Sequence, residues 1–363
     1  MKVIICGGGI IGAATAHYLA RRGVAATVVE RAGVANAASG KAGGFLALDW
    51  CDGSHLEPLA RRSFVLHQRL AEEGFAAWGY RRVATYAGRA DALARPRTRP
   101  SSAPAPWVAH TVSVDQKLGS LATTAQVDPA ALTRGLMAAA AAAGATLVTG
   151  TVTGIRRDGA GDVNGVLVDG EVLGADAVVL ALGPWSLLAA RWLPLPAVYG
   201  IKGHSILYRT GEDVPAEALF LQARARSGEV LTPEIFPRAD GTTYVSAISS
   251  EAPLPVDPAA VEPDRGAFDR LEAMAEDISP AFRRERVVGR QTCFRPVTVD
   301  GLPLIGSIPD APGAYVATGH SVWGILNGPA TGEAMADLLV DGDASALDLA
   351  PFDPARLAPH RPR

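Results

Sequence analysis

The sequence predicts an α/β protein in which a nucleotide-binding unit with a parallel sheet carries an inserted unit with an antiparallel sheet. Residues 2–30 read as strand, glycine-rich turn, helix and strand, the local pattern of a βαβ unit. Apolar strands are also predicted over 177–182 and 314–318, so the parallel sheet draws on both ends and the middle of the chain. Beyond residue 195 the pattern changes to short strands separated by turn residues. These strands are predicted at 205–208, 229–237 and 242–248, with Ala239-Asp240-Gly241 as a hairpin turn.

The glycine-rich turn predicts a dinucleotide site. Gly7, Gly9 and Gly12 follow the apolar run 3–6 in the spacing G-x-G-x-x-G. The first glycine permits a tight turn, the second lets a pyrophosphate approach the backbone, and the third lets the helix pack closely on the sheet. The helix N-terminus adds unpaired N–H groups and a partial positive charge. Glu30, eighteen residues after Gly12, can accept hydrogen bonds from ribose hydroxyls. A glycine-rich turn in an ordinary α/β protein is the alternative.

Composition narrows the classes of protein that remain. The chain has 363 residues, of which 48% are hydrophobic and 20% charged, as expected for a globular protein of one or two domains. A net charge of −3 argues against a nucleic-acid partner. The three cysteines have no metal-site spacing, so we expect no metal and a reducing, cytoplasmic location. No uninterrupted apolar run approaches the ~20 residues of a membrane span, and glycines interrupt the N-terminal run that otherwise suggests a signal peptide.

The remaining elements follow from local patterns. Asp128 precedes Pro129, which predicts a helix capped by the aspartate and ending near Gly144. Residues 87–106 are rich in Arg, Pro, Ser and Ala and are predicted to be an exposed insertion without a site. Further predictions are a small-residue loop over 36–48, helices over 56–73, 264–277 and 329–340, and strands over 146–156 and 163–168.

These elements divide the chain into two units. The nucleotide-binding unit is expected to comprise residues 1–85, 120–195 and 290–345. The substrate unit is expected to comprise 86–119 and 196–289. Residues 346–363 contain many prolines and are predicted to form a mobile tail.

Five segments, taken in order, resemble the D-amino-acid oxidase superfamily of FAD-dependent oxidoreductases, which includes glycine oxidase and sarcosine oxidase. The resemblance covers nearly the whole chain, and the stretch 39–51 resembles a less-studied branch of that superfamily. The segments are Gly7–Gly12 with Glu30, Ala38–Gly44, Val127-Asp128-Pro129 with Val152, Val178–Ser186, and Arg295-Pro296 through Asp300–Gly306 to Gly319-His320, Gly324-Ile325 and Pro329.

The resemblance implies a Rossmann-type, glutathione-reductase-like FAD-binding domain with an inserted α+β substrate domain. It implies that Ser39–Gly43 line the pyrophosphate and flavin, that the backbone of Val152 meets the adenine, and that the last helix starts at Gly328-Pro329 and points at the flavin pyrimidine ring. The helix dipole there would favour the anionic reduced flavin. The cofactor-binding residues expected are Gly7, Gly9, Ile10, Ile11, Gly12, Glu30, Arg31, Ser39, Gly40, Lys41, Ala42, Gly43, Gly44, Val152, Ala181, Gly183, Trp185, Cys293, Gly319, His320, Gly324, Ile325 and Leu326.

The resemblance also implies a reaction. An amine or amino acid is expected to transfer hydride to flavin N5, and O2 then to reoxidise the flavin and give H2O2 and an imine. The cofactor supplies the chemistry while the protein binds, orients and excludes water. No acid/base pair is evident from spacing, and none is required if the amine enters deprotonated.

Arg295 is the first candidate for substrate binding. In glycine oxidase-like proteins an arginine at this place holds the substrate carboxylate, for which a planar guanidinium offers two parallel donors. The alternative is an arginine paired with a structural acid or carbonyl. The stretch Ser321-Val322-Trp323 lacks the second basic residue often found there, so either Arg295 works alone or the substrate is larger and less polar, with Trp323 against its ring or chain.

Other candidates are less specific. Cys293 stands seven residues before Asp300, the spacing at which sarcosine oxidases carry a covalent flavin thioether; a buried small hydrophobe is the alternative. Lys202 and His204 could face the flavin or activate oxygen, or be structural. Further pocket candidates are Tyr199, Glu234 and Tyr244, with Lys41 and Asp49 near the flavin loop and His17 and Cys6 expected only to pack.

Three alternatives to an oxidase stay open at this point. A dehydrogenase could pass electrons from an amine or 2-hydroxy acid to a quinone or another carrier. A flavoprotein scaffold could bind FAD and act through protein contacts. An NAD-dependent enzyme is disfavoured, because the downstream flavin segments would then be unexplained. The sequence leaves the substrate, its stereochemistry and the oligomeric state open.

Overall fold

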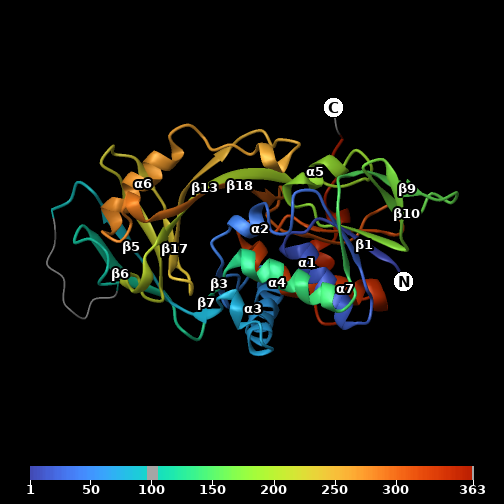
Figure 1. Ribbon diagram of the computed structural model, residues 1–363, viewed down its shortest axis with the longest axis horizontal. Coiled ribbons are helices and arrows are strands. Elements are labelled where there is room, and N and C mark those ends of the chain that lie inside the picture. Colours follow the sequence, from blue (N-terminus) through green and yellow to red (C-terminus); the bar gives the residue numbers. More distant parts are fainter. Residues whose placement is uncertain (96–104, 362–363) are drawn as a thin grey trace.

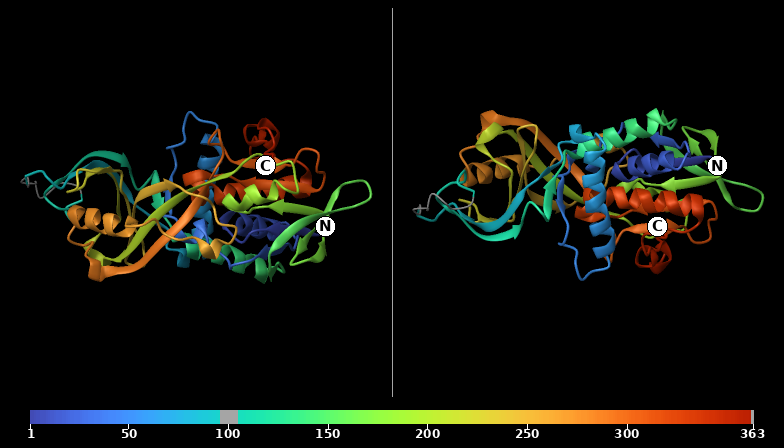
Figure 2. Two further views of the ribbon diagram at one scale, coloured as in Figure 1. Left: turned by 90° about the horizontal axis from the view of Figure 1, so that it is seen from above. Right: turned by 90° about the horizontal axis from the view of Figure 1, so that it is seen from below.

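The computed structural model describes residues 1–95 and 105–361. The molecule is elongated, with a six-stranded sheet in one half and an eight-stranded sheet in the other (Figures 1 and 2). Two long strands, β13 (Tyr199–Arg209) and β18 (Val287–Val297), run from the eight-stranded half toward the other half. The end of β18 forms a bridge between Val297 and His320, so the two halves meet along this line.

The six-stranded sheet confirms the predicted α/β class. Its order is β19-β20-β12-β1-β2-β8, with β19 antiparallel at one edge and the other neighbours parallel. The strands come from the start, middle and end of the chain, as predicted. Their bounds are β1 Val3–Cys6, β2 Thr27–Glu30, β8 Thr146–Thr149, β12 Ala177–Leu180, β19 Leu304–Ser307 and β20 Ala314–Thr318.

Helices and a small sheet cover the two faces of this parallel sheet. One face packs on α1 (Ile10–Arg21), α3 (Glu57–Glu72), α4 (Pro129–Ala142) and α7 (Gly324–Asp341) in a single apolar core. The other face packs on an antiparallel sheet and the short helix α5 (Ser186–Ala189). That sheet comprises β9 Val152–Arg157, β10 Val163–Val168 and β11 Glu171–Gly174. The predicted strand over 146–156 is therefore two strands in different sheets.

The eight-stranded sheet has the order β18-β13-β17-β16-β14-β5-β6, with β15 paired to β14. Helix α6 (Ala267–Ile278) packs its apolar side on one face of this sheet. Its pairs are antiparallel except β14 with β5, which is parallel and was not predicted. The further bounds are β5 Ala84–Asp91, β6 Val112–Gly119, β14 Glu217–Arg224, β15 Val230–Leu231, β16 Glu234–Pro237 and β17 Thr242–Glu251.

The predicted exposed insertion over 87–106 is wrong for its first residues. Residues 87–91 belong to β5, and Ala90 is buried in the core under α6. The run of Arg and Pro obscured a strand whose partner, β14, lies more than a hundred residues away. Residues 96–104 lie outside the described part of the chain. β18 also belongs to this sheet over 290–297, which the predicted division had placed in the nucleotide-binding unit.

The predicted small-residue loop over 36–48 is partly regular. It folds into the short helix α2 (Ala38–Lys41) and the strand β3 (Phe45–Ala47). β3 pairs with β7 (Thr124–Gln126), which also pairs with β4 (Arg81–Arg82). This three-stranded sheet places the loop next to the N-terminus of α4.

Helix α7 begins earlier than predicted. It starts at Gly324, so the predicted start at 328–329 is wrong and Pro329 lies inside the helix. A proline there removes the N–H partner of the Ile325 carbonyl. His67 on α3 supplies a substitute, since its Nε2 lies 3.0 Å from that carbonyl oxygen. Ser63 on the same helix accepts a 3.0 Å hydrogen bond from the N–H that follows the proline. Tertiary contacts thus stabilise the first turn of α7, which local sequence rules exclude because of Pro329.

The C-terminal segment is packed, in contrast to the predicted mobile tail. It forms two 3-10 turns, η7 (Ala350–Phe352) and η8 (Pro354–Arg356). Phe352 is buried in the core of the six-stranded half. The Arg356 guanidinium donates to Asp300 and, at 2.7 Å, to the Leu302 carbonyl. Proline here limits the conformations of the segment without preventing its packing.

Candidate active site

A cavity of about 670 Å³ runs from the first glycine-rich turn to one face of the eight-stranded sheet. Its walls come from both halves of the molecule. The volume falls within the roughly 300–1,000 Å³ usual for small-molecule and cofactor sites. One end is lined by backbone at the carboxyl ends of β1 and β2, and the other by side chains of the antiparallel sheet.

The glycines at the first end are fixed by close backbone approach. Gly7 has φ +113°, and a Cβ there would overlap the Ala181 carbonyl; a Cβ at Gly12 would overlap the Gly7 carbonyl. Helix α1 begins beyond Gly9, which has no side chain to cap its first N–H groups. Only the N–H of Ile10 is seen to find a side-chain partner, the Ser39 hydroxyl at 2.9 Å. This end therefore presents N–H groups and a helix dipole to the cavity, as a pyrophosphate requires.

Glu30 lies at the end of β2 on the same wall. Its two carboxylate oxygens accept hydrogen bonds from the N–H groups of Gly8 (2.7 Å) and Ala32 (2.8 Å), which fix its orientation. Residues 150–153, including Val152, line the adjacent wall.

A loop of the other half crosses over this end. Arg31 donates to the Val256 carbonyl at 3.1 Å, and the Trp185 indole donates to the Pro255 carbonyl at 2.8 Å. Val256 also lines the cavity. Arg31 and Trp185, both predicted to bind the cofactor, therefore also fix this loop over the end of the cavity.

The segment 39–44, called the flavin loop below because it is predicted to line the flavin, forms the middle of the cavity and is held from several sides. Lys41 Nζ donates to the Thr292 carbonyl at 3.1 Å, and Gln126 Nε2 donates to the Gly43 carbonyl at 2.7 Å. A Cβ at Gly43 would stand 2.6 Å from the Phe236 ring, so glycine is needed for this close approach. The backbone of the segment is consequently pinned between the two halves.

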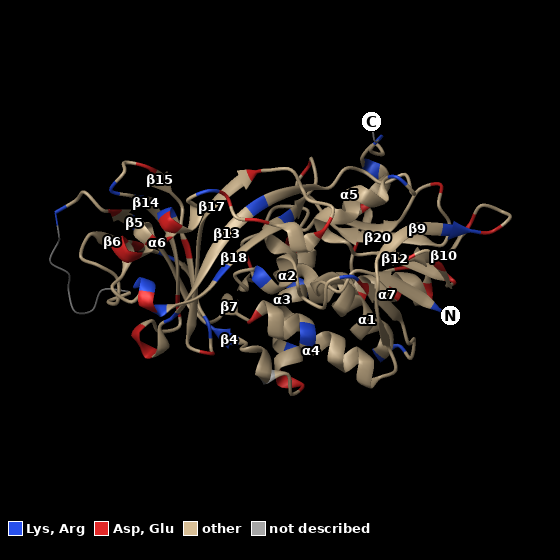
Figure 3. Ribbon diagram, turned by 45° about the horizontal axis from the view of Figure 1, so that its top comes forward, with Lys and Arg blue, Asp and Glu red and all other residues tan. Residues whose placement is uncertain are grey.

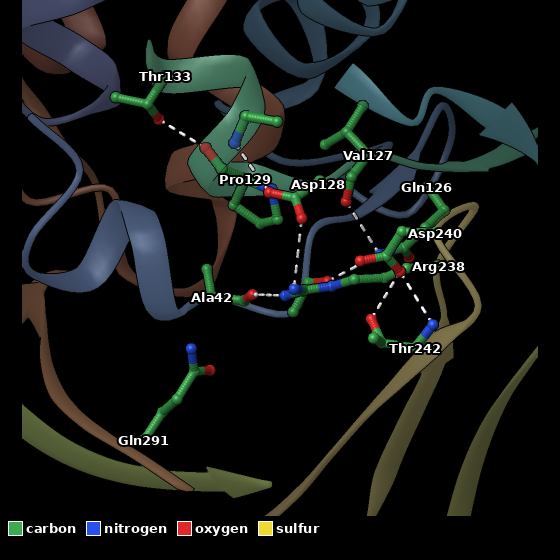
Figure 4. Close-up of polar contacts among 12 residues, drawn as sticks. Ala42, Gln126, Val127, Asp128, Pro129, Thr133, Arg238, Asp240, Thr242 and Gln291 are labelled. Carbon is green, nitrogen blue, oxygen red and sulfur yellow. Dashed lines mark hydrogen bonds and ion pairs between the residues drawn. The ribbon is translucent and has the colours of Figure 1, made fainter. Parts of the chain in front are cut away.

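Arg238 makes the third connection to this segment (Figure 4). It follows β16 on the hairpin to β17, and its Nη2 donates to the Ala42 carbonyl at 2.9 Å. Its Nη1 lies 3.6 Å from the Asp128 carboxylate, which also caps α4 by accepting from the Ala131 N–H, as predicted. The guanidinium, 5% exposed, thus joins the hairpin, the flavin loop and a helix cap.

Strand alternation decides which side chains of the eight-stranded sheet face the cavity. Successive residues point to opposite faces. Ile235 and Val245 pack under α6 on the far face. Their neighbours in the strands line the cavity, namely Glu234 and Phe236 on β16, Tyr244 and Ser246 on β17, and Cys293 and Arg295 on β18.

Lys202 and His204 both make the contacts of the structural alternative stated for them. Lys202 Nζ forms a 2.7 Å ion pair with Asp264 and is not on the cavity wall. His204 reaches the wall, but its Nε2 accepts a hydrogen bond from the Asp264 N–H at 2.9 Å and its Nδ1 lies 3.3 Å from the Ile248 carbonyl. Burial lowers its pKa, so the ring is neutral and fully engaged. Both side chains hold the loop around Asp264.

Arg295 and Glu234 bring opposite charges into the cavity. Within the residues that the structure describes, neither side chain forms a hydrogen bond or an ion pair. Burial raises the pKa of Glu234, and the Arg295 guanidinium acts in the opposite direction. Burial also raises the pKa of Cys293 to about 11 and that of Tyr244 to about 12, so both are protonated at neutral pH.

Aromatic rings form the wall beside these charges. Phe45 stacks on Phe236 with centroids 5.2 Å apart, and Trp50 lies 4.9 Å from Phe220. Trp323 meets Trp50 edge-on at 6.4 Å. Of this aromatic wall (Phe45, Trp50, Phe220, Phe236 and Trp323), sequence reasoning found only Trp323.

His320 lies where β18 meets α7. It is buried, and burial lowers its pKa to about 3, so it is neutral. Its Nε2 lies 3.0 Å from the Thr331 hydroxyl, whereas its Nδ1 has no partner among the described residues. The residue lines the cavity, and its neutral ring therefore adds no charge to the wall.

Most of the predicted site residues meet in this cavity. Gly12, Gly40, Gly319 and Leu326 are exceptions; a Cβ at Gly40 would overlap a backbone carbonyl, and Leu326 is fully buried in the core. Tyr199 is 49% exposed and also lies off the wall. The wall includes Gly7, Gly9, Ile10, Ile11, Glu30, Arg31, Ser39, Lys41, Ala42, Gly43, Gly44, Val152, Ala181, Gly183, Trp185, His204, Tyr244, Cys293, Arg295, His320, Trp323, Gly324 and Ile325.

The fold and this cavity define a dinucleotide-dependent oxidoreductase whose cofactor site opens onto an antiparallel sheet. The family model described as FAD dependent oxidoreductase (DAO) matches residues 2–338, so the chain belongs to that family. The recognition made from the sequence is confirmed.

Relatives of known name align with this chain over nearly its whole length. Glycine oxidase of Geobacillus kaustophilus is 32% identical over 388 residues, covering 98% of this chain and 96% of that protein. Glycine oxidase of Pseudomonas putida is 28% identical over 374 residues, covering 97% and 98%. The crystal structure of the Geobacillus enzyme matches with a TM-score of 0.79 at 28% identity, covering 99% of this chain and all of that one.

The cofactor is FAD, and the residues present fit it. The glycine turn, where a Cβ at Gly7 or Gly12 would overlap backbone, and the α1 N-terminus suit the pyrophosphate, while Glu30 and the backbone near Val152 suit the adenosine end. Among the described residues, no helix is both long and apolar enough to cross a membrane. Basic and acidic residues are interspersed along the ribbon in Figure 3.

Proposed function

We propose that this FAD-dependent oxidoreductase oxidises an α-amino acid with an apolar or aromatic side chain, with O2 as electron acceptor. The observation that carries the proposal is the unpaired guanidinium of Arg295 on the cavity wall. Arg295 is half-buried and has no protein partner among the described residues, so its donors are free to take an anionic group of a ligand. A carboxylate matches the two parallel donors of a guanidinium.

The aromatic wall supports the apolar side chain. Its rings line the cavity next to Arg295, whereas Ser321-Val322-Trp323 adds no second cation. A substrate as small as glycine would leave this apolar surface in contact with water. Burying it against a ring or an aliphatic chain contributes about 25 cal/mol per Å².

The chemistry divides between cofactor and chain. Bound FAD supplies the electron acceptor for the C–H bond beside the amine. Arg295 orients the substrate through its carboxylate, and the aromatic wall excludes water and aligns the side chain. The imino acid product hydrolyses in solution, and O2 leaves as H2O2.

Anaerobic titration of the FAD-loaded protein tests this proposal. Amino acids with apolar side chains should bleach the flavin absorbance, whereas 2-hydroxy acids should not. Oxygen uptake should then exceed dye reduction; the reverse would favour a dehydrogenase. No bleaching with any amine or amino acid would favour a non-catalytic scaffold and would refute the proposal.

Arg295→Met tests the carboxylate contact. Truncating one partner of a charge-assisted pair costs roughly 2–5 kcal/mol, which lowers kcat/KM for an amino acid by about 30-fold to several thousand-fold. The amine lacking the carboxylate should lose far less. Arg209→Met, on the exposed end of β13, is the control. Equal losses for amino acid and amine would show that Arg295 does not hold the carboxylate.

A further inference from the structure

Glu234 is the one acidic side chain on the cavity face of the eight-stranded sheet, within the residues described. It shares that face of β16 with Phe236, which touches the flavin loop at Gly43. Its cross-strand neighbours are Phe220 and Ser246, so it stands beside the aromatic wall.

Among the described residues, no group forms a hydrogen bond or an ion pair with the Glu234 carboxylate that would explain it as structural. Arg295 lies close enough to affect its protonation, but the two do not come within the 4.0 Å of an ion pair. Lys41, another cation on the wall, donates to the Thr292 carbonyl. An acid that is largely buried and unpaired costs free energy, and such groups cluster at functional sites.

The gap between Glu234 and Arg295 separates opposite charges. An α-amino acid carries a carboxylate and an ammonium on one carbon. A cation and a carboxylate that face the same space without neutralising each other can take these two groups at once. Arg295 alone would bind any carboxylate, so the acid adds selectivity for the amine.

We propose that Glu234 binds the ammonium of the substrate and accepts one proton from it, so that Arg295 and Glu234 together recognise a zwitterion. The inference rests on the proposed function. The N–H bond breaks, the proton forms an O–H bond on Glu234, and the electron pair stays on nitrogen. The neutral amine that results is the form whose C–H bond can be oxidised, because its lone pair stabilises the developing imine.

Electrostatics around the acid are consistent with this role. Burial raises the pKa of Glu234, which favours its protonated form, and Arg295 limits the rise. The other titratable groups that line this side of the cavity, among the described residues, are Tyr244, Cys293, Lys41, and the imidazoles of His204 and His320, whose pKa values are lowered by burial. The first two stay protonated and neutral, so they do not compete for the ammonium.

Binding of non-oxidisable probes tests the charge arrangement. Benzoate presents the carboxylate alone and benzyltrimethylammonium the cation alone; both can be titrated into FAD-loaded protein by perturbation of the flavin spectrum. Glu234→Gln should bind benzoate about tenfold tighter and the cation about tenfold more weakly, because one negative charge is lost. Glu234→Asp should retain the wild-type order. Unchanged dissociation constants for both probes would overturn the proposal.

The pH profile tests the proton transfer. In the wild type, kcat/KM for the amino acid should decrease as the pH drops below the pKa of Glu234. In Glu234→Gln this decrease on the acid side of the pH profile should begin at least one pH unit higher, toward the pKa of the free ammonium. Glu251→Gln, exposed at the end of β17, is the control. A decrease that begins at the same pH in both proteins would overturn the transfer.

The two proposals fail separately. If Arg295→Met abolishes benzoate binding while Glu234→Gln changes nothing, the proposed function survives and this inference is wrong. If no amino acid bleaches the flavin but the probes respond to Glu234→Gln as expected, zwitterion binding stands and the oxidation is wrong.

Discussion

Removing the guanidinium of Arg238 should loosen the flavin loop and weaken FAD binding. Arg238 links the β16–β17 hairpin to the Ala42 carbonyl and to Asp128, and its guanidinium lies 5.8 Å from the centre of the Tyr244 ring. Arg238→Met keeps most of the buried chain length and removes the donors. The variant thus isolates the polar connection between the two halves.

The expected magnitude follows from exposure and geometry. A hydrogen bond from a charged donor contributes about 1.5–3 kcal/mol. The pair with Asp128 adds little, because its N···O distance is 3.6 Å and the Asp128 side chain is 24% exposed. The buried Nε of Arg238 has no partner within residues 1–95 and 105–361, so removing it recovers part of the loss. We expect about 1–3 kcal/mol lower stability, or roughly 1–4 °C in Tm at ~2.1 cal/mol/K per residue.

FAD affinity is the more direct readout. If the loop must be reordered when the cofactor binds, the same 1–3 kcal/mol appears as a roughly 5- to 150-fold increase in the FAD dissociation constant. Reconstitution of apoprotein, followed by flavin fluorescence quenching, measures it. Arg238→Lys should be intermediate, since it keeps the charge without the fork, and Arg209→Met should match the wild type. Wild-type FAD affinity and Tm in Arg238→Met would refute this account of the hairpin contact.

Three further predictions concern single positions. Gly12→Ala should abolish FAD binding because its Cβ overlaps the Gly7 carbonyl, whereas Gly159→Ala, which meets no atom within 4 Å, should retain the flavin-to-protein absorbance ratio. Burial lowers the pKa of His67 from 6.5 to about 4, so the ring is neutral in the folded protein. The contribution of His67 to stability should therefore be lost as the pH falls through that window, and it amounts to about 3 kcal/mol relative to His67→Gln. A difference between the two proteins in the free energy of denaturant unfolding that does not depend on pH would contradict this. FAD should separate fully from denatured protein, because the buried Cys293 thiol stays protonated, and flavin retained in the wild type but lost in Cys293→Ser would prove a covalent bond instead.

The parts of the fold that were predicted correctly are those that depend on local sequence patterns. The glycine turn, the Asp128 cap and the hairpin turn at 239–241 each depend on a few consecutive residues. The parallel sheet followed because buried strands read as apolar runs. These features need no knowledge of distant partners.

The errors came from contacts between distant segments. The start of α7 depends on His67 and Ser63, which replace the hydrogen bonds that Pro329 removes. β5 depends on a parallel partner far along the chain. Neither interaction leaves a mark in the local sequence, so propensity rules started the helix too late and assigned the strand to an insertion.

The sequence named more of the cavity-lining residues in the glycine-rich backbone segments than on the strands of the eight-stranded sheet. Resemblance placed Lys202 near the flavin, but strand alternation turns it toward Asp264 and gives the cavity face of β13 to its neighbours. The same alternation places Glu234, which was named as a pocket candidate, and Phe236, which was not, on the cavity face. The period of the strand was visible in the sequence, but the identity of the buried face was not.

One short stretch of chain links recognition of substrate to retention of cofactor. Residues 234–238 place Glu234 in the cavity, Phe236 against Gly43, and Arg238 on the Ala42 carbonyl, over a strand of about 13 Å at ~3.3 Å per residue. A shift of this hairpin must therefore move the ammonium site and the flavin loop together. Arg238→Met should accordingly raise both the FAD dissociation constant and the KM for amino acid, whereas Glu234→Gln should alter substrate binding and leave FAD affinity unchanged. A variant of Arg238 that weakens FAD without affecting KM in the fully loaded enzyme would show that the two sites are mechanically independent.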